Sequence, residues 1–155
     1  MEATTMQALT HAGAFCAIGL AAAGSGLGTG AAGAAAVGAW KKCYAQDRPA
    51  PFQLAVFAGA PLSQTIYGMI LMFLISDKAA QASAYWPAFL IIGIVAGVGM
   101  GISAWFQGKA GAGACDALAE TGKGFTNYLM ALGIIETCAI FVMAFAIVLL
   151  TKIGA

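Results

Sequence analysis

Hydrophobic and polar residues follow each other along this chain in long blocks. Four apolar runs are separated by short polar breaks at 41–51, 76–86 and 116–124. Each run reaches the ~20 residues that an α-helix needs to cross the hydrocarbon core of a bilayer. The pattern therefore predicts four membrane-spanning helices, over about residues 8–44, 52–76, 86–116 and 124–152.

The breaks leave room for tight connections only, so consecutive helices must run antiparallel. Backbone groups in hydrocarbon have to be paired within the protein, which favours helices throughout. We therefore expect an all-α membrane protein made of two helical hairpins, residues 1–78 and 79–155. The first apolar run lacks a basic start and is too long for a cleavable signal peptide, so we expect it in the mature protein.

Composition supports a lipid environment and excludes other classes of protein. Hydrophobic residues make up 61% of the 155 residues and charged residues 8%, whereas a soluble domain has about 25% charged residues. Mean hydropathy is +0.88. The net charge is +1 without any basic run, so we expect no nucleic-acid partner. The four cysteines form no CxxC pair and are typical of small apolar fillers, and the lone His11 is typical of an interfacial residue.

The distribution of lysine and arginine predicts the orientation in the membrane. Five of the seven basic residues lie in or beside the first and third breaks, and the positive-inside rule places such segments in the cytoplasm. Both termini and the middle break then face outward, and the loops at 41–51 and 116–124 are cytoplasmic. The five are Lys41, Lys42, Arg48, Lys109 and Lys123, against Lys78 and Lys152.

The first apolar run is unusually poor in side chains. Fifteen of the nineteen residues from Ala21 to Ala39 are alanine or glycine. Glycines four residues apart strip one face of a helix and let backbones approach closely, as a helix packed against copies of itself requires. The alternatives are a flexible low-complexity linker or, for "GSGLGTG", a phosphate-binding loop. Hydrophobic flanks argue against the first, and the pattern within a membrane helix is weak support for the second.

The two hairpins are related by an internal repeat. Residues 25–36 align with 103–114 at an offset of 78, with six identities that include Ser25 with Ser103 and Gly30 with Gly108. The second and fourth runs match more loosely, and their alignment places Gln64 opposite Glu136. The chain therefore has the pattern of a duplicated hairpin in which one half carries an amide and the other a carboxylate.

Glu136, in "GIIETCAIF", is the ionisable residue that the apolar pattern does not explain. A charged carboxylate at the bilayer centre costs at least ~2.5–3.5 kcal/mol, so it needs a partner, a proton or access to water. We interpret Glu136 as a functional site. The alternative is a protonated glutamic acid that hydrogen-bonds between helices.

Polar residues at a matching depth in the other helices could surround this carboxylate. Pro61 disrupts the second helix and leaves carbonyl oxygens loosely held near Phe57 to Ala60. Ser63 and Tyr67 then stack on one face with Gln64 beside them, and the third helix contributes Gln107. Singly, each of these residues could equally hydrogen-bond between helices.

Together these groups form a set of oxygen ligands around one negative charge. Oxygen ligands without histidine or thiolate suit a hard cation, and one carboxylate balances one positive charge. The set therefore predicts a site for a monovalent ion, Na⁺ before K⁺. Tyr67 could donate its phenolic proton to Glu136 and orient it. A proton-binding site would need the glutamate and one or two donors.

At this point the chain resembles a known family over nearly its whole length. The Ala/Gly-rich first helix, the duplicated hairpin, "PLSQTIYG", "FQGK" and "ETCAI" are similar to the proteolipid subunit K, or c, of V-type rotary ATPases, in its sodium-translocating bacterial version. The resemblance implies that Glu136 and Tyr67 share a hydrogen bond. It implies as Na⁺ ligands the backbone carbonyl of Ala60 and the side chains of Ser63, Gln64, Gln107 and Glu136.

Two features depart from the sodium-translocating pattern. Ser63 stands where those members have threonine, and Trp105 and Phe106 interrupt the glycine-rich pattern in the third helix.

The resemblance also implies a function and partners. It implies a rotor ring of identical copies in the cell membrane, with the first and third helices inside. Glu136 carries Na⁺ past a stator subunit with an essential arginine, and a central-stalk subunit docks on the cytoplasmic loops. ATP hydrolysis occurs on other subunits, so we expect a non-catalytic chain without a cofactor other than the transported ion. The alternatives are the same rotor carrying H⁺ and a small four-helix dimeric secondary transporter.

Overall fold

The computed structural model describes residues 1–153, and every regular element in that range is a helix. The second span is interrupted, and a single-turn 3₁₀ helix lies inside it. A second short 3₁₀ helix precedes the third span. In chain order the elements are α1 (Ala3–Ala45), α2 (Leu54–Gly59), η1 (Ala60–Leu62), α3 (Ser63–Lys78), η2 (Ser83–Tyr85), α4 (Trp86–Thr121) and α5 (Phe125–Lys152).

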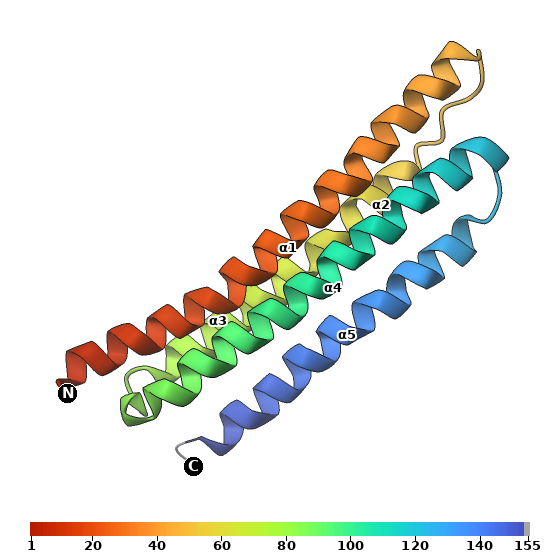
Figure 1. Cartoon of the computed structure of the whole chain (residues 1–155). Helices are drawn as coiled ribbons and strands as arrows, with labels where there is room; N and C mark the ends of the chain where they lie inside the picture. Colours follow the sequence, from red (N-terminus) through yellow and green to blue (C-terminus); the bar gives the residue numbers. More distant parts are fainter. Residues whose placement is uncertain (154–155) are drawn as a thin grey trace.

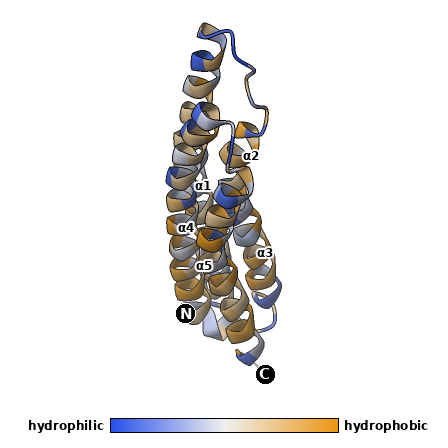
Figure 2. Cartoon of the chain, turned by 90° about the vertical axis from the view of Figure 1, so that its right-hand side faces the viewer, coloured by the Kyte–Doolittle hydropathy of each residue, from blue (hydrophilic) through white to orange (hydrophobic). Residues whose placement is uncertain are grey.

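The four spans form an elongated antiparallel bundle (Figure 1). α1 and α4 run side by side, α2 and α3 lie behind them, and α5 packs along α4. Four helical segments of the described chain are long and apolar enough to cross a membrane. Residues along most of these helices are hydrophobic, whereas the connection between α1 and α2 is hydrophilic (Figure 2). The predicted all-α fold with four membrane-spanning helices is confirmed.

The helices α1 and α4 extend beyond the predicted bounds. α1 begins at Ala3 instead of residue 8, and α4 ends at Thr121 instead of residue 116. The 43 residues of α1 span about 65 Å, roughly twice the hydrocarbon core of a bilayer. Outside the lipid a helix can continue through polar residues, because the backbone bonds stay within the helix. The α4–α5 turn is therefore short, and Gly122 and Gly124 adopt the positive φ values of 66° and 89° that glycine permits.

α1 and α4 pack backbone against backbone. A Cβ atom added at Gly24 would collide with the backbone of Gly101, and one added at Gly108 would collide with that of Gly28. The face of α1 that carries Gly24 and Gly28 is thus covered by α4, the repeat counterpart of α1 in the same chain. Four further glycines of α1 meet no atom within 4 Å and leave open surface, namely Gly26, Gly30, Gly33 and Gly38.

The aromatic residues Trp105 and Phe106 do not interrupt this packing, contrary to the interpretation of the sequence. Both are exposed, at 39% and 51%, and neither is among the nearest atoms that a Cβ added at Gly101 or Gly108 would meet. Lys109 is exposed beside them, with its Nζ 4.4 Å from the centre of the Trp105 ring. A cation on this face is stabilised by the aromatic ring.

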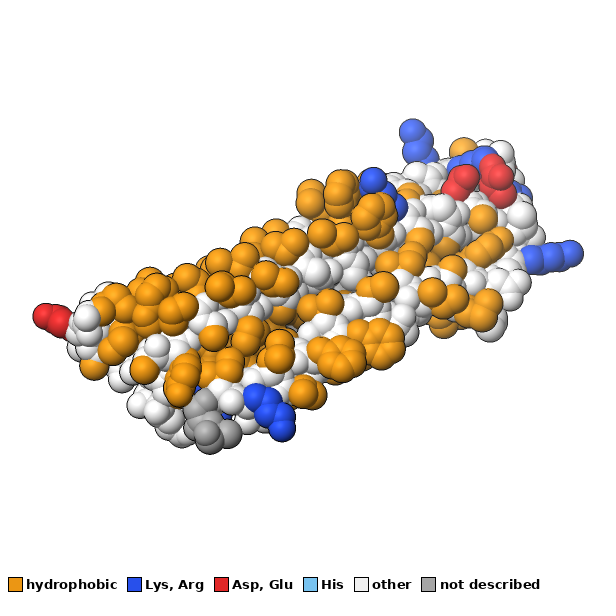
Figure 3. Space-filling model, turned by 60° about the horizontal axis from the view of Figure 1, so that its bottom comes forward, with side chains coloured by type: hydrophobic (Ala, Val, Ile, Leu, Met, Phe, Trp, Pro, Cys, Tyr) orange, Lys and Arg blue, Asp and Glu red, His pale blue; other side chains and the backbone are white. Residues whose placement is uncertain are grey.

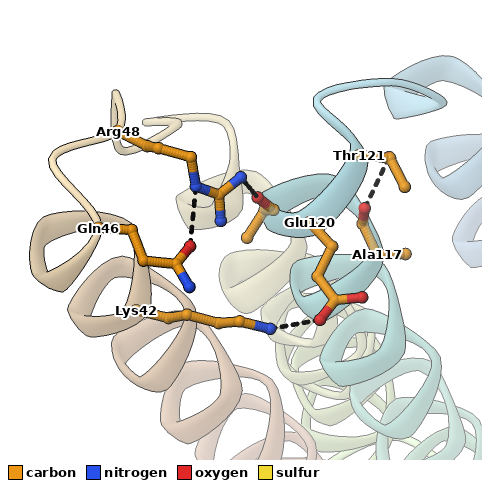
Figure 4. A network of polar contacts seen from close by, with 7 residues as sticks. Lys42, Gln46, Arg48, Ala117, Glu120 and Thr121 are labelled. Atoms are coloured by element: carbon orange, nitrogen blue, oxygen red, sulfur yellow. Dashed lines mark hydrogen bonds and ion pairs between the residues drawn. The ribbon is translucent and has the colours of Figure 1, made fainter.

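Polar contacts link residues at the end of the bundle that carries the α1–α2 and α4–α5 connections. Lys42 forms an ion pair with Glu120, and Arg48 Nη1 donates to the Ala119 carbonyl at 3.3 Å (Figure 4). Trp40 Nε1 donates to the Pro51 carbonyl at 2.7 Å. Figure 3 shows most charged side chains near the two ends of the molecule, with hydrophobic side chains between them. An exposed ion pair is screened by solvent and stabilises little, so these contacts orient the loops more than they hold the fold.

The α1–α4 interface predicts a strong asymmetry among glycine substitutions. Gly108→Ala places a methyl group on the backbone of Gly28 and should destabilise the fold by about 1–3 kcal/mol. Gly133→Ala in α5 meets no atom within 4 Å and should be neutral or stabilising by up to ~1 kcal/mol. Thermal unfolding in detergent, followed by circular dichroism, measures both. Equal unfolding midpoints for the two variants would contradict the packing.

Candidate ion-binding site

The break in the second span lies at Pro61. Proline has no amide hydrogen to continue the helix, and residues Ala60–Leu62 form a 3₁₀ turn between α2 and α3. Ser63 begins α3, and its Oγ donates to the Ala60 carbonyl oxygen at 3.1 Å. The turn therefore places a backbone carbonyl and a hydroxyl side by side at the start of α3.

Two fully buried glutamines connect α3 with α4. Gln64 Nε2 donates to Gln107 Oε1 at 2.8 Å, and both side chains are 0% exposed. Ser63 Oγ lies 3.2 Å from Gln64 Oε1. Amides in a dry interior are costly unless their hydrogen-bonding groups are satisfied, so this pairing fixes both side chains.

Glu136 of α5 lies at the end of this polar chain and is partly buried. Tyr67 donates its hydroxyl hydrogen to Glu136 Oε1 at 2.6 Å, and Gln107 Nε2 donates to Oε2 at 3.2 Å. The carboxylate is thus held by α3 and α4 together. Within residues 1–153 the ion pair is the one between Lys42 and Glu120. No lysine or arginine of this range is therefore ion-paired with Glu136.

The structure brings all six predicted site residues to one place, where the spans α3, α4 and α5 meet. The oxygen atoms present are the Ala60 carbonyl, Ser63 Oγ, the two amide oxygens and the Glu136 carboxylate. An amide oxygen that accepts one hydrogen bond keeps a second lone pair for a cation. Among the described residues, no three histidine, cysteine, aspartate or glutamate side chains lie close enough together to hold a metal ion. This donor set suits a hard monovalent cation as cargo.

The orientation of Gln107 is not the one expected from the sequence. Its amide nitrogen faces Glu136, and its oxygen accepts from Gln64. Gln107 therefore acts as a hydrogen-bond donor to the carboxylate in this arrangement. A cation beside Glu136 would compete with that donated bond for the same carboxylate oxygen.

Sequence reasoning missed Ser103 of α4. Its Oγ donates to the carbonyl oxygen of Ile135, the residue before Glu136, at 2.9 Å. Gln107 Nε2 also reaches the Leu132 carbonyl, at 3.1 Å. Two signals pointed to Ser103. It lies four residues before Gln107 and so shares its helix face, and it is one of the identities of the repeat.

Comparisons with known proteins agree with these features. The sequence model of the ATP synthase C-subunit family matches residues 90–149, which cover most of α4 and α5. The chain is 34% identical over 142 residues to the A-type ATP synthase subunit K of Methanocaldococcus jannaschii. That alignment covers 91% of this chain and 61% of the relative, so the chain spans less than two thirds of the relative's length.

The site predicts selective chemical modification of one carboxyl group. Dicyclohexylcarbodiimide reacts with protonated carboxyl groups in apolar surroundings, and Glu136 combines such surroundings with partial burial. The reagent should label Glu136 and spare the exposed Asp116 and Glu120. Peptide mass spectrometry of the labelled protein locates the adduct. An adduct chiefly on Asp116 or Glu120 would refute the assignment of the site.

Proposed function

We propose that the chain belongs to the ATP synthase C-subunit family and is the ion-carrying proteolipid of a V/A-type rotary ATPase. One observation carries the proposal. Glu136, the carboxylate of an apolar span, is held by donors from two other helices beside a group of oxygen ligands. A carboxylate in a membrane span is retained when it binds something that crosses the membrane. The chain itself is non-catalytic, and ATP hydrolysis on other subunits drives it.

We propose Na⁺ as the cargo, with H⁺ as the alternative. Five groups that can offer oxygen, Glu136 included, meet at the site, more than a proton requires, and together they replace the hydration shell of a small cation. The ligands are the Ala60 carbonyl and the side chains of Ser63, Gln64, Gln107 and Glu136, with Tyr67 orienting the carboxylate. Serine at 63 has the same hydroxyl oxygen as threonine, so it supplies the same ligand atom.

The proposed assembly is a ring of identical copies. Each copy presents an open glycine face on α1, which includes Gly26 and Gly30, and a neighbouring copy can approach closely there. α1 and α4 form the inner layer, and the interrupted α2–α3 span and α5, which carry the ligands other than Gln107, face outward. Glu136, partly exposed, can then meet a stator subunit, whose arginine displaces the ion at each step.

The chain is a multi-pass membrane protein, and we propose its orientation from charge. The end of α1 and the α1–α2 and α4–α5 connections carry basic residues, including Lys41, Arg48 and Lys123. These segments face the cytoplasm, where a central-stalk subunit docks on them. Both termini lie at the opposite end of the bundle (Figure 1) and face outward.

Replacing the carboxylate tests the function directly. Glu136→Gln keeps the volume and the hydrogen bonds to Tyr67 or Gln107 but cannot neutralise a cation. Ion transport by the reconstituted ATPase should fall to background while the ring assembles normally. The control is Glu120→Gln, the same chemical change at the exposed ion pair with Lys42, which should transport at the normal rate. Normal transport by Glu136→Gln would refute the proposal, and a dimer on detergent sizing would favour a secondary transporter.

Competition between Na⁺ and the carbodiimide separates the two cargoes. A bound Na⁺ keeps Glu136 ionised, so it should protect against labelling, and more strongly at higher pH because fewer protons compete. Gln64→Leu removes one amide oxygen and should raise the Na⁺ concentration for half-protection at least tenfold, while labelling at low pH survives. The control is Gln53→Leu, at an exposed position of the same span. Labelling curves that ignore Na⁺ would favour the proton rotor.

A further inference from the structure

α5 buries few of its residues fully. Four of its 28 residues are buried, namely Leu132, Ala139, Ala146 and Leu150. Partly buried side chains such as Tyr128, Val142 and Met143 also pack against the core, and large side chains on the other faces are exposed. Apolar contacts are not directional, so the polar contacts beside Glu136 define most sharply which way it points.

Two side chains of α4 hydrogen-bond the backbone of α5 in the turn before Glu136. Ser103 Oγ donates to the Ile135 carbonyl at 2.9 Å, and Gln107 Nε2 donates to the Leu132 carbonyl at 3.1 Å. Carbonyls within a helix already accept one bond from their own helix, and these use the second lone pair. Contacts to the backbone, unlike contacts to a side chain, hold the helix itself at one rotation and one height.

We propose that Ser103 is a positioning residue that holds α5 in the rotation at which Glu136 meets Tyr67 and Gln107. Successive helical residues are about 100° apart, so a turn of that size would move Glu136 out of the site. Ser103 does this without contacting the carboxylate or the ion. The inference deepens the proposed function, because it assumes that Glu136 is the ion-carrying group.

The internal repeat supplies a matched control. Ser25 of α1 occupies the repeat position of Ser103, and the two serines are 2% and 5% exposed. Ser25 Oγ has no hydrogen-bond partner among the described residues, whereas Ser103 Oγ has the Ile135 carbonyl. Replacing either serine by alanine removes a buried hydroxyl group. Only Ser103→Ala also removes a hydrogen bond to the backbone of α5.

The experiment compares Ser103→Ala with Ser25→Ala and the unmodified protein in detergent-solubilised rings. Carbodiimide labelling of Glu136 is measured against pH without Na⁺, and then against Na⁺ concentration at fixed pH. A turn of α5 moves Glu136 out of the site and exposes it to the reagent. In Ser103→Ala the rate of labelling without Na⁺ should rise about fivefold at each pH, the effect of one typical hydrogen bond. The Na⁺ concentration for half-protection should rise about fivefold as well.

The control results decide the interpretation. Ser25→Ala should leave labelling unchanged, because Ser25 Oγ has no partner among the described residues. A Ser103→Ala profile equal to that of the unmodified protein would overturn the inference, and so would equal shifts in both variants. If Na⁺ protects none of the proteins, the proposed cargo fails, but the Na⁺-free pH profiles still test the role of Ser103.

Discussion

The organisation of this protein depends on the cost of one carboxylate in hydrocarbon. At mid-bilayer a charged side chain is unfavourable by at least ~2.5–3.5 kcal/mol, and Glu136 is stabilised by hydrogen bonds instead of by a fixed cation. Tyr67 and Gln107 donate to its two oxygens, and Gln64 holds Gln107 in turn. Because these donors are neutral, they leave the negative charge of an ionised Glu136 without a fixed counter-charge. This is the condition that the proposed carriage of a cation requires.

The glycine contact between α1 and α4 makes this arrangement possible. With the backbones of Gly28 and Gly108 in direct contact, the core between these two helices contains few side chains. α4 can then use its neighbouring faces for α3 and α5, and Gln107 reaches both Gln64 and Glu136. Side-chain volume at this interface would push the helices apart and lengthen those hydrogen bonds. The close contact between α1 and α4 therefore fixes the position of α4, and with it the position of Gln107 in the site.

The α5 span differs from the other three in how it is held. It buries few large side chains, and its contacts with α4 include hydrogen bonds from Ser103 and Gln107 to its backbone. Hydrogen bonds are directional, whereas apolar contacts between a helix and its surroundings are not, so α5 has one favoured orientation without tight packing. A helix held in this way can present its carboxylate to the site and still yield when a stronger electrostatic partner arrives.

The sequence by itself determined the class of fold and the identity of the polar group. Four apolar runs in a chain with 8% charged residues leave helices in a bilayer as the possible architecture. Glu136, Gln64, Gln107, Ser63 and Tyr67 stood out because polar residues are rare in such runs. Tertiary structure decided what residue types alone could not. It turned the nitrogen of Gln107 toward Glu136, extended α1 and α4 past their predicted bounds, and left Trp105 and Phe106 exposed. It also gave Ser103 a partner that Ser25 lacks. The reason is that each of these outcomes depends on the rotation and separation of neighbouring helices, which arise when the backbones pack together.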